Sequence, residues 1–153
     1  MLINTLQKHK LSKAWFYTLS FTWGLPITLI GCIYALIFAI TNHKPKRFGY
    51  CLYFESKKLS GGFNVGPFIF VCSSPSRSLL AHEHGHALQN CFYGPFMAVL
   101  VAMPSCVRYH YRRFVRRCLK KPLKNPYDSI WFENEATVIG KALCSGFIDE
   151  TTV

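Results

Sequence analysis

The stretch "SLLAHEHGHALQN" at residues 78–90 brings together side chains that bind metal ions and transfer protons. It contains the pattern H-E-x-x-H, in which His82 and His86 are four positions apart. On a helix both imidazoles would project from one face and could reach a single ion, whereas His84 would point away. Glu83 would lie beside that ion, where it could take a proton from a bound water. The alternative is a polar helix face at a membrane surface.

A third ligand is expected, because a catalytic zinc site usually has three protein ligands and leaves one position for water. The downstream stretch "WFENEATVIG" offers Glu133 and, as a second choice, Glu135. Glu133, Ala136 and Gly140 would share one helical face, and these small residues facing Gly85 would let two helices approach closely enough for one ion to bridge them. The alternative for Glu133 is a solvated or salt-bridged carboxylate.

The two segments together resemble the gluzincin-type zinc metallopeptidases. In the membrane-bound branch with H-E-x-G-H, the third ligand often occurs in an E-x-x-A-D pattern, and residues 133–137 read E-x-x-A-T. The resemblance implies that Glu133 is a ligand. Thr137 replaces the aspartate that would orient a ligand histidine, and Asp128 or Glu135 could substitute for it.

A wider resemblance covers nearly the whole chain from "TWGLP" onward. It is to small bacterial membrane proteins that share a membrane anchor, a strand pair, an H-E-x-G-H-x-x-Q-N helix and a late "YD.IWFE..A" helix. This likeness implies a zincin-like site with no established substrate.

Composition indicates a membrane protein. Half of the 153 residues are apolar, yet the formal net charge is +11, and residues 14–41 contain no charged side chain. That length predicts a transmembrane helix, with a kink near Gly24 and Pro26, rather than a buried core helix. A basic nucleic-acid binder is the main rival, but it would not need such an uncharged run.

The expected fold is an α+β membrane protein. Residues 92–107 are too short and too proline-rich for a simple span, and a span there would separate Glu133 from the histidines, so we expect a re-entrant or interfacial segment. The predicted units are a basic head and anchor at 1–47 and a zincin-like domain at 48–153. From its N-terminal end, the domain is expected to contain a β-hairpin (48–73), the H-E-x-x-H helix (75–91), the apolar segment (92–107), a basic segment (108–124) and the ligand helix (128–145).

The basic segment predicts a lipid-headgroup anchor on the cytoplasmic face more readily than a phosphate-backbone contact. Within it, Tyr109 and His110 could supply an electrophile that stabilises an oxyanion, although each fits the role of an interfacial aromatic better.

We therefore predict a membrane-associated Zn²⁺ peptidase in which His82, His86 and Glu133 bind the metal and Glu83 is the general base. The edge of a strand at residues 66–72 could align an extended peptide. Expected partners are the lipid bilayer, in a bacterial inner membrane with the site toward the cytoplasm, and a peptide or membrane-protein substrate, with no nucleic acid. The alternatives are a zinc-binding membrane protein without proteolysis and a basic membrane-surface or nucleic-acid binding module.

Overall fold

A single mixed sheet forms the centre of the protein, whose computed structural model describes residues 12–119 and 130–146. The strand order is β1-β2-β4-β3. The β1/β2 and β3/β4 pairs are antiparallel, whereas the central β2/β4 pair is parallel. The strands are β1 (Lys46–Phe48), β2 (Cys51–Ser56), β3 (Gly62–Val65) and β4 (Phe68–Cys72).

The predicted single hairpin over residues 48–73 is wrong. Two short hairpins form instead, and their reversals contain Gly49 and Gly66, whose φ angles of 57° and 65° are ones that glycine adopts without strain. Residues 57–61 do not form a hairpin turn, because the strands on either side of them, β2 and β3, are not paired with each other. Both pair with β4 instead. This parallel pairing places β4 inside the sheet and leaves β3 at its edge, beside the histidine-rich helix.

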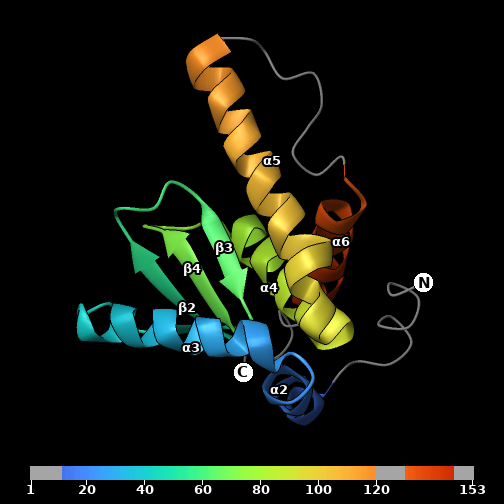
Figure 1. Cartoon of the computed structure of the whole chain (residues 1–153). Coiled ribbons are helices and arrows are strands. Elements are labelled where there is room, and N and C mark those ends of the chain that lie inside the picture. The colour runs from blue at the N-terminus through green and yellow to red at the C-terminus, as the bar shows by residue number, and fades with distance from the viewer. Residues whose placement is uncertain (1–11, 120–129, 147–153) are drawn as a thin grey trace.

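Helices cover both faces of the sheet (Figure 1). On one face lies α3 (Leu25–Ile40), where Tyr34 and Phe38 pack against Phe70 with ring centroids 5.8 and 4.9 Å apart. On the other face lies α4 (Arg77–Tyr93), and α6 (Trp131–Gly146) packs against α4. Because successive residues of β4 point to opposite faces, Ile69 and Val71 join the core beneath α4.

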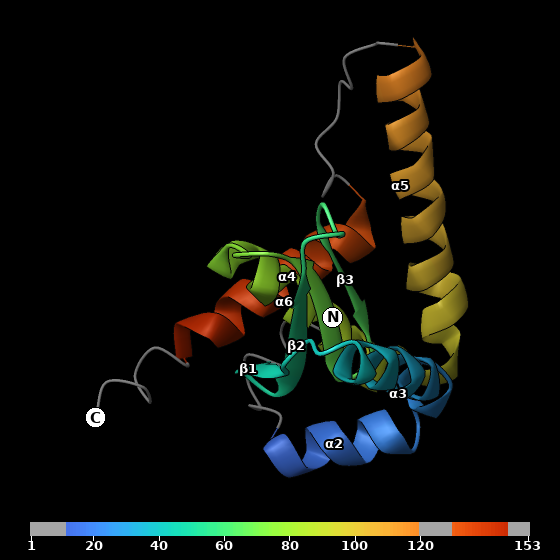
Figure 2. The same ribbon diagram turned by 90° about the vertical axis from the view of Figure 1, so that its left-hand side faces the viewer.

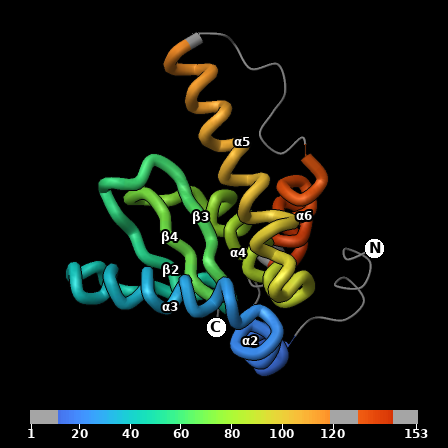
Figure 3. The backbone as a smooth tube through the Cα atoms, viewed as in Figure 1, coloured from blue at the N-terminus to red at the C-terminus, as the bar shows by residue number. Residues whose placement is uncertain are grey.

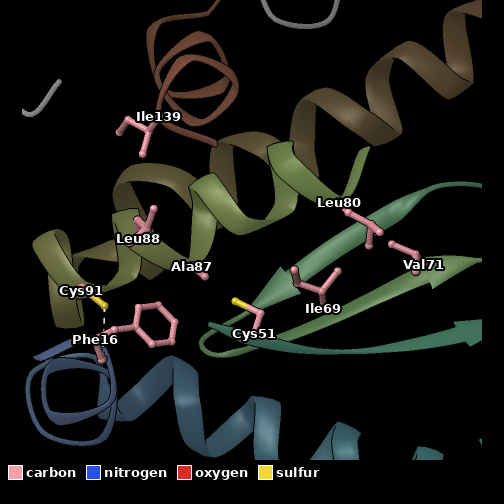
Figure 4. Close-up of a cluster of buried hydrophobic side chains, with 9 residues drawn as sticks. All are labelled: Phe16, Cys51, Ile69, Val71, Leu80, Ala87, Leu88, Cys91 and Ile139. Carbon is pink, nitrogen blue, oxygen red and sulfur yellow. Dashed lines mark hydrogen bonds between the residues drawn. The ribbon is translucent and has the colours of Figure 1, made fainter. Parts of the chain in front are cut away.

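The main core connects distant parts of the chain (Figure 4). Phe16 from α2 (Lys13–Phe21) is fully buried and belongs to the same core cluster as Ile69, Val71 and Leu88. Ile139 of α6 belongs to the same cluster. α2 is therefore part of the core around the sheet and α4.

The predicted transmembrane helix is wrong. Residues 14–41 form two helices, α2 and α3, whose axes differ by 95°. The bend occurs at Gly24, with Pro26 in the first turn of α3, and the Thr28 hydroxyl donates to the Ser20 carbonyl at 2.7 Å across the bend. Over the described ranges, no single helix is both long and apolar enough to cross a membrane; two bent helix pairs reach the required length and composition only when both members are counted together.

The short apolar segment predicted at 92–107 is wrong as a separate element. After the turn at η1 (Gly94–Phe96), the chain continues through η2 (Ala98–Ala102), α5 (Met103–Phe114) and η3 (Val115–Leu119) as one long helical rod (Figure 3). Pro104 does not end this rod. The wider π-helical turn of η2 lies just before Pro104 and accommodates the proline, which has no N–H to donate.

Two helices occupy the places predicted for the site. α4 begins after Ser76, whose hydroxyl accepts from the Leu79 N–H at 3.2 Å, two residues later than predicted. α6 begins at Trp131, so its described part corresponds to most of the predicted ligand helix. Residues 120–124 of the predicted basic segment, and Asp128, lie outside the described residues.

Candidate metal centre

Close packing of α4 against α6 creates the site. Gly85 lies directly against the backbone carbonyl of Ala136, and Gly140 lies directly against that of Ala81. A Cβ atom at either glycine would overlap the facing carbonyl oxygen, so only glycine allows this separation of the helices. The predicted role of small residues at this crossing is confirmed.

The three predicted ligands come together at this crossing. The Glu133 Oε2 atom lies 3.2 Å from the Nε2 atom of His82 and 3.3 Å from the Nε2 atom of His86. One donor atom from each residue lies within 4.8 Å of the other two, a spacing that could hold a metal ion. Glu133 is fully buried, whereas the side chains of His82 and His86 are 17% and 10% exposed.

The hydroxyl of Thr137 determines which nitrogen of His82 faces the site. It lies 2.9 Å from Nδ1 of His82 and donates its hydrogen to the Glu133 carbonyl at 3.0 Å. Because that one hydrogen is already used, the Thr137 oxygen accepts from the Nδ1–H group of His82. Nε2 of His82 is then directed toward Glu133. Thr137 thus orients His82. In the resembled pattern an aspartate has this role, and we had predicted that Asp128 or Glu135 would replace it.

Gln89 has the same effect on His86. Its side-chain oxygen lies 2.8 Å from Nδ1 of His86, and its amide nitrogen donates to the Phe132 carbonyl at 2.9 Å and to Glu135 at 3.0 Å. Since the amide nitrogen is committed to these acceptors, its oxygen accepts from Nδ1–H of His86. Glu135 also accepts from the Tyr93 hydroxyl at 2.8 Å. Glu135 therefore supports His86 through Gln89 and does not face the three ligand atoms.

The rod that contains α5 supplies a contact that the sequence analysis missed. The Ser105 hydroxyl donates to Oε1 of Glu133 at 2.6 Å. One carboxylate oxygen is thereby held by the serine, while Oε2 faces both imidazoles. No local pattern around residue 105 points to this contact, because it depends on where the rod passes over α6.

Glu83 lies between α4 and the edge strand. Its Oε1 atom is close enough to Gly62 of β3 that a Cβ atom there would approach to 2.8 Å. Burial raises the pKa of Glu83 above its ordinary value, and the positive charges of His86 and His82 oppose this only in part. A carboxylate with a raised pKa beside a metal site suits a general base that works near neutral pH.

The ligands themselves form a strongly polarised group. Burial by itself raises the pKa of Glu133, but hydrogen bonds with His82, His86 and Ser105 hold it well below its ordinary value. Burial likewise lowers the pKa of His86, but its contacts with Glu133, Glu83 and Gln89 raise it to a net value above the ordinary one. Glu133 is therefore the buried negative charge of the cluster, and it attracts positive charge, either a proton on an imidazole or a metal ion.

The other predicted residues that the structure describes do not belong to the three-ligand cluster. Tyr109 is exposed on α5 and its hydroxyl accepts from Arg113 at 3.4 Å, while His110 beside it is also exposed. Asp128 lies outside the described residues. His84 is buried away from the ligand atoms and accepts from the Tyr50 N–H at 3.2 Å, and burial lowers its pKa to about 4.

No protein-family model, curated protein or solved structure matches this chain. The resemblance to gluzincin peptidases and to small bacterial membrane proteins therefore stays a prediction, and the function has to be inferred from the chemistry of the site.

Proposed function

We propose that His82, His86 and Glu133 bind Zn²⁺. Two neutral imidazoles and one carboxylate form a donor set typical of catalytic zinc. In a tetrahedron with metal–ligand bonds of about 2.0 Å, neighbouring ligand atoms are about 3.3 Å apart. The separations of 3.2 and 3.3 Å from Glu133 Oε2 to the two Nε2 atoms fit this value. Both imidazoles are also held in the tautomer that leaves Nε2 available.

We infer that the site hydrolyses peptide bonds. Zinc, when bound, acts as a Lewis acid and lowers the pKa of a coordinated water. Glu83 would serve as the general base, holding a proton on its carboxylate and passing it to the leaving amine. The observation that supports this role most directly is the buried carboxylate of Glu83, which follows His82 on α4 and interacts electrostatically with His82, His86 and Glu133, and whose pKa is raised by burial.

The position of β3 at the edge of the sheet favours a peptide as the substrate. β3 is an edge strand, and Gly62 within it is the neighbour of the Glu83 carboxylate. An extended peptide that paired with this edge would pass beside Glu83. The predicted aligning strand at 66–72 is not at an edge, because β4 lies between β2 and β3.

The direct test is to measure zinc content and peptide cleavage for the wild type and for Glu83→Gln. We expect both to bind about one zinc ion per chain and only the wild type to cleave, because glutamine cannot accept the proton. Glu55→Gln is the matched control, since Glu55 is a surface carboxylate paired with Lys46 at 2.8 Å and should leave both quantities unchanged. A wild-type protein without metal would exclude the proposal.

The low exposure of the ligand side chains favours a second candidate. With Glu133 at 0% and His86 at 10%, the site also suits a zinc ion that serves assembly or sensing without proteolysis. Stoichiometric zinc with no cleavage that depends on Glu83 would support this alternative and exclude the peptidase.

A further inference from the structure

An apolar stripe runs along the outer face of α3. Its members, spaced at i, i+4, i+7, i+8 and i+11, share one side of the helix and are between 50% and 76% exposed. They are Leu29, Ile33, Leu36, Ile37 and Ile40. The opposite side of α3 packs on the sheet through Tyr34 and Phe38. The helix is therefore apolar all round, although only one side has a partner within the described ranges.

A second stripe runs along the helical rod. Its residues, at i, i+3, i+7, i+11 and i+14, again share one side and are between 43% and 65% exposed. They are Leu100, Met103, Val107, Tyr111 and Phe114. An exposed stripe of this length is uncommon on an isolated protein, and it usually marks a surface that contacts something else.

The two helices that carry these stripes lie on one side of the molecule. In Figures 1 and 2, α3 and α5 lie on the same side of the sheet and α4, and they run in different directions rather than side by side. Two divergent helices that expose apolar residues on a common side present a broad face and not a single line of contact. We call α3 and the rod at 98–119, with their exposed stripes, the apolar face.

Cations accompany the apolar face. Arg113, Arg116 and Arg117 are exposed near the end of the rod, and Lys44 is exposed just after α3. In residues 12–119 and 130–146, two of the four acidic residues, Glu83 and Glu133, are buried in the metal centre. A third, Glu55, is paired with Lys46. The charge around the face is therefore strongly positive and complements a negatively charged surface.

We propose that the apolar face rests on an anionic phospholipid bilayer, with α3 and α5 lying along the surface. Helices with an exposed apolar stripe flanked by arginines lie in the plane of a membrane, with the apolar side among the upper acyl chains and the cations among the headgroups. The bends of 95° between α2 and α3 and of 117° between α4 and the rod suit this side-on contact. A second copy is a poorer occupant, because it would bring like-charged arginines together.

The test is flotation of the full chain with preformed vesicles, either of phosphatidylcholine alone or of phosphatidylcholine and phosphatidylglycerol in equal parts. We expect strong binding to the mixed vesicles and weak binding to the neutral ones. Ile33→Gln and Val107→Gln, one on each helix, should each weaken binding about tenfold. Replacing Arg116 and Arg117 by glutamine should weaken it roughly fivefold for each charge removed.

Trp131→Gln is the matched control, because Trp131 is a large apolar residue of α6 that is 56% exposed and lies outside the apolar face. Its variant should bind as the wild type does, and circular dichroism should show that all variants fold. The proposal is overturned if the wild type does not float, or if the face variants float as well as the control. It is also overturned if the wild type does not bind vesicles and light scattering shows that it is a dimer, whereas the face variants are monomers.

Discussion

At the scale of single residues, the chemistry of the site depends on the hydrogen bond that Nδ1 of each imidazole makes. Thr137 accepts from His82 and Gln89 accepts from His86, so both Nε2 atoms face Glu133. Such hydrogen bonds hold a metal-binding ring in one tautomer and orientation, and losing one typically costs 10- to 100-fold in metal affinity. Thr137, a departure from the resembled pattern, is thus an orienting residue in its own right.

Thr137→Val should therefore weaken zinc binding by roughly 10- to 100-fold, because valine has a similar shape but cannot accept the His82 proton. Thr137→Ser keeps the hydroxyl and should restore most of the affinity. Competition with a chromophoric chelator would measure both variants. Wild-type affinity in Thr137→Val would show that His82 is oriented by other contacts.

At the scale of secondary-structure elements, the separation between α4 and α6 controls whether the ligands can meet. Two ligands come from α4 and one from α6, and the contacts at Gly85 and Gly140 bring the helices together. A metal site of this kind tolerates little change in helix spacing, because ligand positions matter to within a fraction of an ångström.

Gly140→Ala should destabilise the protein by roughly 1–3 kcal/mol and also weaken zinc binding, because the added methyl overlaps the Ala81 carbonyl and must push the helices apart. Urea denaturation of the metal-free protein would measure the first effect and chelator competition the second. Gly61→Ala is the matched control, since a Cβ at Gly61 would meet nothing within 4 Å. Equal stability of the two variants would contradict the packing argument.

At the scale of the whole molecule, the candidate metal centre connects parts of the chain that are far apart in sequence. Glu133 of α6 contacts both histidines of α4, while Ser105 of the rod holds its other oxygen. A metal ion that binds only when these segments are assembled must stabilise the folded state through mass action.

Zinc at about 100 times its dissociation constant should add about 2.7 kcal/mol of stability, which corresponds to roughly 5–10 °C in Tm for a chain of this length. Removal of zinc by a chelator should reverse the shift in a thermal melt followed by circular dichroism. Glu133→Gln should fold but show little zinc-dependent shift. A wild-type Tm that does not respond to zinc would argue against the three-residue site.

The sequence by itself determined the parts of this protein that depend on helical periodicity. His82 and His86 share a face because they are four residues apart, and the small residues after Glu133 indicated the close crossing with α4. These predictions needed only the repeat of one helix and the sizes of its side chains. A different local signal, a glycine and a proline two positions apart, located the bend at Gly24 and Pro26.

Only the tertiary structure decided the rest. The pairing of β2 with β4, the folding of α2 and α3 onto the core and the contact from Ser105 each join residues that are distant in sequence. Such contacts are selected by the burial energy of the whole assembly and not by a local repeat. For this reason the uncharged run at residues 14–41 predicted a membrane span, although it forms two helices, one packed into the core and the other against the sheet.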